Sequence, residues 1–88
     1  MLFVALLVQK FGGTSVGDPE RMRAVAGHVA RTVREGNQVV VVISAMGKET
    51  DDLLRIAAEV SDTRPGREMD MLVTAGERKA MALLCMAI

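Results

Sequence analysis

Hydrophobic residues along this chain form two kinds of pattern, short continuous runs and stripes at helical spacing. The runs cover residues 2–8 and 39–43 and consist almost entirely of aliphatic side chains. Continuous runs of this length are typical of strands covered on both faces of a parallel sheet, so we predict a buried strand at each. Apolar side chains that recur every three to four residues predict helices over residues 19–34, 51–60 and 67–88. The order strand, helix, strand, helix, helix predicts an α/β fold with parallel strands.

Capping residues mark the expected ends of the first two helices. Asp18 is a suitable N-cap and Pro19 a suitable first residue for the first helix, and Gly36 stands where that helix should stop. Thr50 is predicted to cap the second helix, with acidic residues at positions 51–52 in the first turn, where the helix dipole favours them. Both predicted strands therefore end in a loop that leads directly into a helix.

The loop after the first strand carries the most informative residues. Lys10 precedes the adjacent glycines Gly12 and Gly13, and two hydroxyl residues and a third glycine follow within residues 14–17. A glycine turn before a helix can direct several backbone N–H groups at one anion, because glycine tolerates unusual dihedrals and lets a phosphate approach closely. We interpret the loop as a phosphate-binding site with Lys10 at its mouth. The residue order excludes a P-loop, whose lysine follows the glycines, and the spacing excludes a G-x-G-x-x-G fingerprint.

A second polar loop follows the second strand at residues 44–50. Because ligands bind at the carboxyl edge of open α/β sheets, we expect both loops to contribute to one site. On pattern alone, each candidate also has a structural explanation: the glycine loop as a tight turn with an exposed lysine, Ser44 as a turn residue and Thr50 as a cap. Glu77 follows Gly76, a glycine inside the last helix, which usually marks a close approach by backbone or ligand. An exposed glutamate on a helix is equally commonplace.

Composition reduces the classes of ligand and compartment that the sequence supports. The 88 residues carry eleven basic and eleven acidic side chains, so no net charge attracts nucleic acid or an anionic membrane. Two phenylalanines are the only aromatic residues, which removes the stacking platforms that single-stranded nucleic acid needs. The single cysteine, Cys85, forms no intrachain disulfide, and we expect a cytoplasmic protein. His28 has no second histidine or cysteine at ligand spacing, so we predict a structural role for it and no metal site.

The length and the ends of the sequence predict an incomplete domain. Residues 1–88 make at most one small domain. The opening apolar run lacks the basic start and cleavage site of a signal peptide and is far shorter than the roughly 18 residues of a membrane span. The last predicted helix ends on an apolar stretch at 83–88 without a capping signal. A sheet of two strands is also too small to cover the apolar faces of all the predicted segments. We therefore expect the N-terminal piece of a longer domain.

Three blocks of the sequence resemble the aspartate kinases, a branch of the amino-acid kinase family. They are K-F-G-G-T-S-V-G at residues 10–17, V-V-I-S-A-M-G at 41–47 followed by Thr50, and M-D-M-L-V-T-A-G-E-R at 69–78. Acetylglutamate, glutamate, carbamate and uridylate kinases share the lysine and paired glycines, but the three blocks together are specific to the aspartate branch. The resemblance implies an α/β, three-layer αβα fold with a parallel sheet, like that of carbamate kinase. Residues 1–88 would be the N-terminal β-α-β-α-α part of its catalytic domain, without the regulatory ACT domains of the bacterial lysine-sensitive type.

The resemblance also implies a reaction, its cofactors and its site residues. The γ-phosphoryl group of ATP, bound with Mg²⁺, would pass to the side-chain carboxylate of L-aspartate and give 4-phospho-L-aspartate and ADP. This is the first step of lysine, threonine and methionine synthesis. Lys10 would be the catalytic residue, because it neutralises charge as the phosphoryl group moves. Aspartate would be bound by Ser44, Thr50 and Glu77, with Glu77 facing the substrate ammonium. ATP would be bound by Lys10, Phe11, Gly12, Gly13, Thr14 and Ser15.

Two departures from the family pattern qualify these expectations. Glu49 stands beside Thr50 where many members carry a threonine, and the chain stops before the family's adenine pocket and effector domains. We expect the parent protein to be an oligomeric enzyme and the 88-residue piece alone to be inactive. The alternatives are a non-catalytic truncated remnant or interaction module, and another amino-acid kinase that forms an acyl phosphate.

Overall fold

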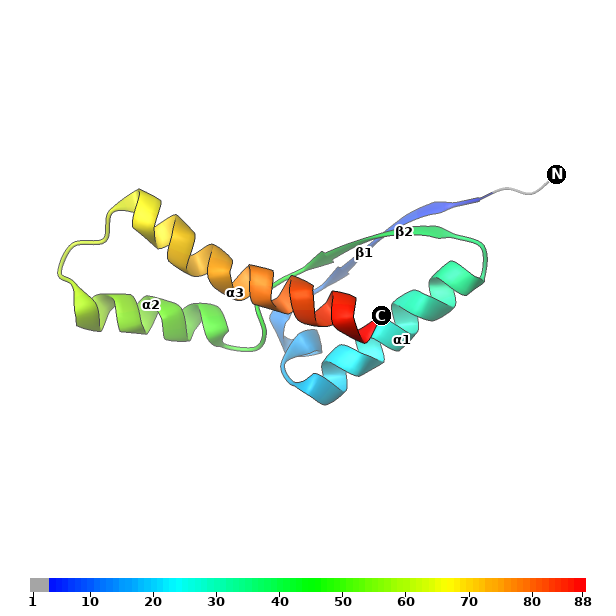
Figure 1. Ribbon diagram of the computed structural model, residues 1–88, viewed down its shortest axis with the longest axis horizontal. Helices are drawn as coiled ribbons and strands as arrows, with labels where there is room; N and C mark the ends of the chain where they lie inside the picture. Colours follow the sequence, from blue (N-terminus) through cyan, green and yellow to red (C-terminus); the bar gives the residue numbers. More distant parts are fainter. Residues whose placement is uncertain (1–3) are drawn as a thin grey trace.

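The computed structural model describes residues 4–88, and its elements follow the predicted order (Figure 1). One short 3₁₀ helix, η1, is added between the first strand and the first long helix. The elements are β1 (Leu6–Phe11), η1 (Gly13–Val16), α1 (Pro19–Arg34), β2 (Gln38–Ile43), α2 (Glu49–Val60) and α3 (Gly66–Ala87).

The two strands pair in parallel, as the strand-helix-strand order predicts, but β1 is shifted along the sequence. It was expected over residues 2–8, of which 2 and 3 lie outside the described residues, and it continues through Lys10 to Phe11. The pairing of Lys10 with Val42 and of Phe11 with Ile43 extends the strand, because β2 offers backbone partners up to its own end. Lys10 therefore lies on the strand and not in the glycine turn.

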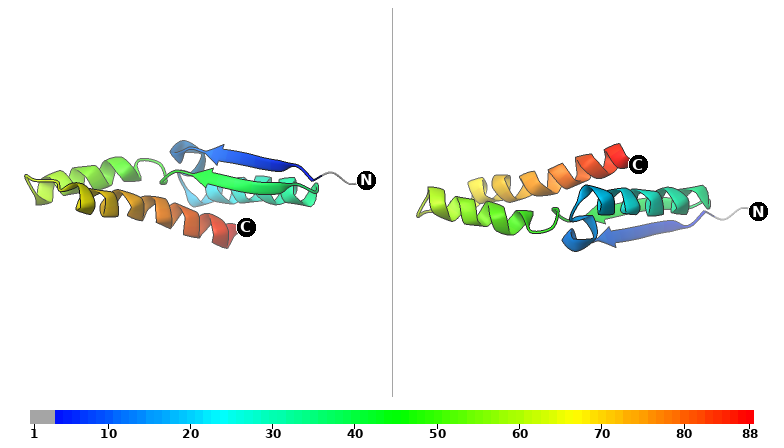
Figure 2. Two further views of the ribbon diagram at one scale, coloured as in Figure 1. Left: turned by 90° about the horizontal axis from the view of Figure 1, so that it is seen from above. Right: turned by 90° about the horizontal axis from the view of Figure 1, so that it is seen from below.

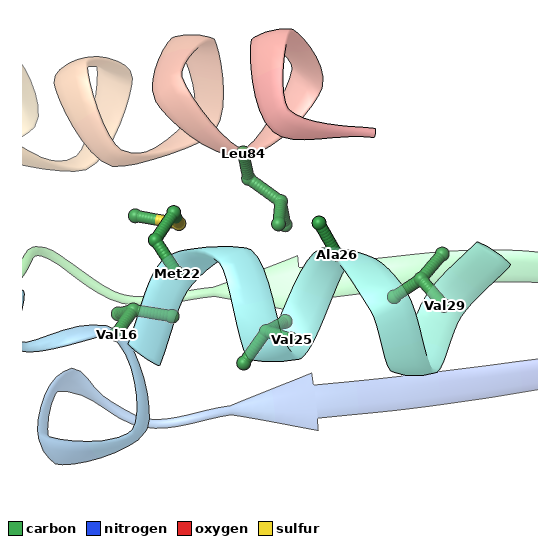
Figure 3. Packing of buried hydrophobic residues seen from close by; sticks show 6 residues of the cluster. All are labelled: Val16, Met22, Val25, Ala26, Val29 and Leu84. Atoms are coloured by element: carbon green, nitrogen blue, oxygen red, sulfur yellow. The ribbon is translucent and has the colours of Figure 1, made fainter. Parts of the chain in front are cut away.

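One face of the sheet is covered by helices. In Figures 1 and 2, α1 and the C-terminal part of α3 lie on the same side of the two strands. The core between them is made by side chains of η1, α1 and α3, with inward-facing residues of both strands packed against it (Figure 3). Its buried members are Val16, Met22, Val25, Ala26, Val29 and Leu84.

The other face of the sheet is uncovered in this structure. It carries Leu6 and Val8 of β1, which are 65% and 68% exposed, and Val40 and Val42 of β2, which are 48% and 45% exposed. The predictions of a strand covered on both faces at residues 39–43 and of a buried strand at residues 2–8 are therefore wrong for the residues that the structure describes. Both helices that contact the sheet pack on the same side, so alternate side chains of each strand remain in solvent.

Helix α1 begins and ends at the predicted capping residues. The Asp18 carboxylate accepts a hydrogen bond from the backbone N–H of Arg21 at 2.8 Å, and Pro19 is the first helical residue. Gly36 follows the helix with φ of +96° and donates its N–H to the carbonyl of Val33. A left-handed glycine after the last turn is a common helix stop, so both predicted ends are confirmed.

Helix α2 begins earlier than predicted, and Thr50 is not its cap. The helix starts at Glu49, and the capping position is occupied by Lys48, whose side chain makes no capping hydrogen bond. The reason is the preceding turn at Gly47, where φ is +52° and the chain folds back so that the N–H of Glu49 reaches the carbonyl of Met46 at 2.9 Å. Thr50 consequently lies inside the first turn of the helix.

Helix α3 connects the two halves of an elongated molecule. The principal extents are 60 × 26 × 17 Å, and Figure 1 shows α2 and the start of α3 side by side, away from the sheet. The C-terminal part of α3 continues past α1, where Leu84 joins the core. None of the helices within residues 4–88 combines the length and apolar character needed to span a membrane.

Candidate functional site

The two predicted loops meet at the carboxyl ends of the neighbouring strands. The N–H of Gly47 donates to the carbonyl of Gly13 at 2.9 Å, and the N–H of Ser44 donates to the carbonyl of Phe11 at 3.3 Å. A Cβ placed on Gly13 would lie 2.9 Å from the carbonyl oxygen of Ala45 and 3.0 Å from that of Gly47. Glycine is therefore required at position 13 because the backbone of the second loop passes directly over it. These contacts join the two loops at one edge of the sheet.

Gly12 occupies a different environment from its neighbour. Its φ is −78°, and an added Cβ would find no heavy atom within 4 Å. Positive φ among the described glycines is confined to Gly36 and Gly47, so the expectation that unusual dihedrals require the glycine pair is wrong. The close approach at Gly13 comes from the protein itself, whereas the space above Gly12 is open to a ligand.

Lys10 lies at the end of β1 on the uncovered face of the sheet. It pairs in the ladder with Val42 and alternates with Val8, so its side chain leaves the strand on the side opposite α1. The side chain is exposed and takes part in no ion pair or hydrogen bond with another described residue. Its ammonium group is thus free to meet an anionic ligand.

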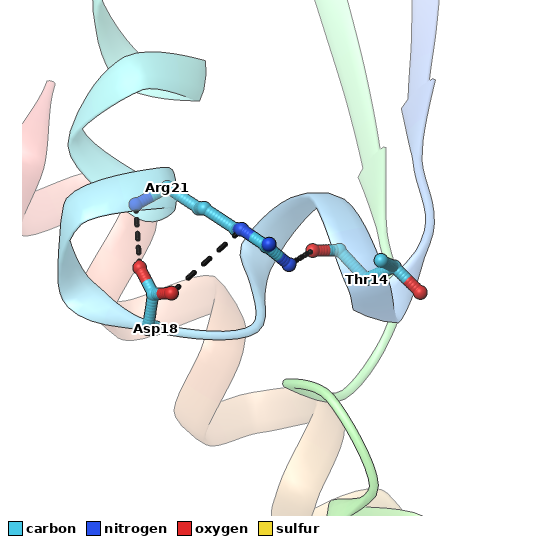
Figure 4. A network of polar contacts seen from close by, with 3 residues as sticks. All are labelled: Thr14, Asp18 and Arg21. Atoms are coloured by element: carbon cyan, nitrogen blue, oxygen red, sulfur yellow. Dashed lines mark hydrogen bonds and ion pairs between the residues drawn. The ribbon is translucent and has the colours of Figure 1, made fainter.

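Thr14 and Ser15 lie in η1, which is held against the start of α1 by Arg21. The guanidinium Nη1 of Arg21 donates to the carbonyl of Thr14 at 3.0 Å, and its Nε lies 3.7 Å from the carboxylate of Asp18 (Figure 4). Both hydroxyl residues line an open hollow of about 460 Å³ that also includes Arg21 and His28. Arg21 fixes the backbone of η1, while the two hydroxyls remain exposed.

Phe11 and His28 pack against each other in the lining of this hollow. Their rings meet edge to face, with centroids 6.1 Å apart and planes at 79°. The Gln9 amide lies 3.4 Å from Nε2 of His28 and donates to the hydroxyl of Thr32 at 3.2 Å. These contacts fit the predicted structural role of His28, and the ring of Phe11 takes part in the packing between strand and helix.

Ser44 and Thr50 lie in the second loop and in the first turn of α2. Both are half-buried, and neither hydroxyl forms a hydrogen bond with another residue of the described chain. Since Thr50 is not the helix cap, the structural explanation offered by the sequence pattern does not hold for it. Both hydroxyls are available to a ligand.

Glu77 lies on α3, immediately after Gly76, a glycine that packs closely against α2 and the second loop. Gly76 is buried, and a Cβ there would lie 3.3 Å from Cγ of Glu49, 3.3 Å from Cδ1 of Leu53 and 3.4 Å from Cβ of Ala45. The interior glycine thus marks a close approach by protein side chains. Glu77 itself is exposed and unpaired within residues 4–88.

Sequence reasoning missed three residues that build the site. Gly47 makes the turn that joins the loops, Arg21 holds η1, and Lys79 on α3 forms an ion pair with Glu49 on α2. The first two had signals in the sequence. Gly47 is a glycine between a strand and a helix, and Arg21 follows Asp18 by three positions, the spacing of neighbours on a helix. The ion pair of Glu49 and Lys79 had none, because it depends on how two helices pack.

No three acidic, histidine or cysteine side chains within residues 4–88 come together as a metal site. The residues that could contact a nucleotide are the lysine, the open glycine and the hydroxyls described above. Such a set suits an anionic ligand, because it combines one mobile cation with backbone that a phosphate can approach.

Comparison with known proteins gives consistent matches over nearly the whole chain. The sequence model of the amino acid kinase family matches residues 5–88. The aspartokinase of Mycolicibacterium smegmatis is 60% identical over 85 residues, and that of Corynebacterium glutamicum is 56% identical over 85 residues. Each match covers 97% of this chain and 20% of the relative, so the chain spans about one fifth of the length of these curated relatives.

A solved structure gives the same result for the fold. The crystal structure of aspartate kinase from Synechocystis superposes with a TM-score of 0.90 at 54% sequence identity, covering 96% of this chain and 14% of that one. The predicted α/β fold is therefore confirmed. Residues 4–88 form part of it, namely two parallel strands with α1 and α3 on one face, and α2 packed against α3.

Proposed function

Because the chain belongs to the amino acid kinase family, we propose that the protein containing it is an aspartate kinase. It transfers the γ-phosphoryl group of ATP to the side-chain carboxylate of L-aspartate and produces 4-phospho-L-aspartate and ADP. The observation that carries this proposal is the backbone contact between Gly13 and Gly47, because it brings the two loops with uncommitted polar side chains to one edge of the sheet. The identity of 60% with an aspartokinase favours aspartate over other acceptors.

The glycine loop and Lys10 are proposed to act on the phosphates of ATP. Phosphoryl transfer depends mainly on positioning and on stabilising charge, so the protein needs fixed dipoles and cations and no nucleophile of its own. The open space above Gly12 lets a phosphate approach the backbone, and the unpaired ammonium of Lys10 can neutralise charge as the phosphoryl group moves. Thr14 and Ser15 contribute exposed hydroxyls from η1.

Ser44, Thr50 and Glu77 are proposed to bind aspartate. The two hydroxyls can donate to a substrate carboxylate, and the carboxylate of Glu77 can pair with the substrate ammonium. None of the three side chains is engaged with another described residue. The substrate would therefore supply partners that residues 4–88 do not.

We propose that Mg²⁺ accompanies ATP. A magnesium ion in a kinase usually binds substrate phosphates and one or two carboxylates. Within residues 4–88 no three acidic, histidine or cysteine side chains come together, so we propose that the ion is held mainly by the phosphates of ATP. When bound, the ion would supply additional positive charge at the phosphates.

The proposed reaction also sets expectations for the complete protein. It would commit aspartate to lysine, threonine and methionine synthesis, in the cytoplasm, and we propose that the protein acts as an oligomer. A single cysteine, exposed in the structure, suits a reducing compartment.

The test is an ADP-release assay on the complete protein that carries this sequence. We expect ADP release that depends on L-aspartate, and none above background with acetylglutamate or glutamate. A preference for acetylglutamate or glutamate would replace the proposal with another amino-acid kinase. No turnover with any of the three acceptors would favour a non-catalytic remnant or interaction module.

A further inference from the structure

The ion pair between Glu49 and Lys79 differs from the others in the described part of the chain. The pairs of Asp18 with Arg21, and of Arg55 with both Asp52 and Glu59, join residues three or four positions apart. Lys79 and Glu49 instead join α3 to the first turn of α2. The Glu49 side chain is only 24% exposed, so this pair is better shielded from solvent than the neighbours on one helix.

Glu49 also packs against the glycine of α3. Its Cγ lies 3.3 Å from the position that a Cβ of Gly76 would occupy, so the aliphatic part of the side chain covers the surface of α3. The carboxylate then reaches Lys79, one turn further along the same helix. Glu49 thus holds α3 by packing and by charge at once.

The residues next to this contact are the proposed aspartate-binding residues. Thr50 follows Glu49 in the first turn of α2, and Glu77 follows Gly76 on α3. At about 100° per residue, Glu77 and Lys79 lie on opposite sides of the Gly76 contact, at about +100° and −60° around α3. A shift or rotation of α3 against α2 would therefore change the distance between Thr50 and Glu77.

We propose that Glu49 and Lys79 are positioning residues for the acceptor site. Their ion pair fixes α3 against the start of α2 and so sets the separation of the Thr50 hydroxyl and the Glu77 carboxylate. This inference rests on the proposed function, because it assigns the pair a role in binding the same amino-acid substrate. Neither residue contacts the substrate, so their loss acts on substrate affinity through geometry.

Steady-state kinetics of Glu49→Gln, Lys79→Gln and the double variant test the inference in the complete protein. Each single change should raise the KM for aspartate roughly fivefold, as expected for loss of one partly shielded ion pair, with kcat and the KM for ATP within about twofold of the original. The double variant should be no worse than either single variant, because both remove the same interaction. Glu59→Gln, which breaks an exposed pair on α2 away from α3, is the matched control and should leave all three constants unchanged.

The outcomes separate this inference from the proposed function. If the original protein shows no aspartate-dependent turnover, the proposed function is wrong and the inference falls with it. If turnover is normal and the KM for aspartate is unchanged in both single variants, only the inference is wrong. Additive effects in the double variant would also overturn it. So would a fall in kcat and a rise in the KM for ATP as large as the rise in the KM for aspartate. Lys79 is half-exposed, so its variant should fold even where Glu49→Gln does not.

Discussion

Lys10 ends β1 on the open side of the sheet, where its ammonium group has no partner among the described residues. Such a charge is useful to a kinase only if it meets the phosphates more closely in the transition state than in the bound substrate. The sequence analysis predicted that Lys10 belongs to the site but placed it in the glycine turn. Its position on the strand follows from the pairing with β2, which a single run of apolar residues does not reveal.

We therefore expect Lys10→Ala to lower kcat of the complete enzyme by ~10²–10³, with a smaller change in the KM for ATP. Lys10→Arg should restore activity only in part, because a planar guanidinium does not replace a compact point charge. Steady-state kinetics with ATP varied at saturating aspartate measure both. The control is Arg31→Ala, which removes an exposed cation from α1. A kcat near the original value for Lys10→Ala would mean that the glycine turn is only a turn.

The two glycines of the pair should respond differently to alanine. At Gly13 a Cβ would clash with backbone oxygens of the second loop at 2.9 and 3.0 Å, so Gly13→Ala should lower the free energy of unfolding by about 1–3 kcal/mol. At Gly12 the Cβ has open space and φ is −78°, so Gly12→Ala should leave stability unchanged. It should instead raise the KM for ATP about tenfold, because the methyl group occupies the space proposed for a phosphate. Thermal unfolding and ATP kinetics of both variants distinguish these effects, and an unchanged KM for Gly12→Ala would contradict the proposed phosphate position.

Among the elements, helix ends could be predicted where the capping residue acts locally. Asp18 and Gly36 fix both ends of α1 through contacts within four residues, and the sequence identified both. Thr50 failed as a cap because the turn at Gly47 starts α2 two residues earlier than predicted, and that turn is held by the backbone of the glycine loop. At Gly76 the sequence predicted a close approach by backbone or ligand, whereas the neighbours are side chains of α2 and of the second loop, which depend on how the helices pack.

The cap of α1 has a consequence beyond its own helix. Asp18→Ala should lower the free energy of unfolding by about 1–2 kcal/mol, because the N–H of Arg21 loses its acceptor and the guanidinium that holds η1 loses its ion pair. Asp51→Ala removes an acidic residue from the first turn of α2 without breaking a described side-chain contact, and should cost at most about 0.5 kcal/mol. Denaturant unfolding of the complete protein compares the two. Equal losses in the free energy of unfolding for Asp18→Ala and Asp51→Ala would mean that the cap contributes only through the helix dipole.

At the scale of the whole molecule, the order of elements and the parallel pairing could be predicted, but the coverage of the sheet could not. Apolar runs predict that both faces of β1 and β2 are covered, yet they do not show what covers each face. In the structure, α1 and α3 cover one face and leave the other exposed. The radius of gyration is 16.1 Å, whereas a compact domain of this length has about 12 Å.

The 88-residue polypeptide taken alone should therefore behave as an incompletely folded chain. Its uncovered sheet face and the exposed apolar residues of α2, such as Ile56 and Val60, leave too much apolar surface in water for a stable domain of this size. We expect strong binding of a hydrophobic dye, thermal unfolding without a sharp transition, and no aspartate-dependent ADP release. The complete protein under the same conditions is the control and should show weak dye binding, a cooperative transition and turnover. A cooperative transition of the 88-residue polypeptide with weak dye binding would show that one covered face of the sheet is enough to stabilise this part of the fold.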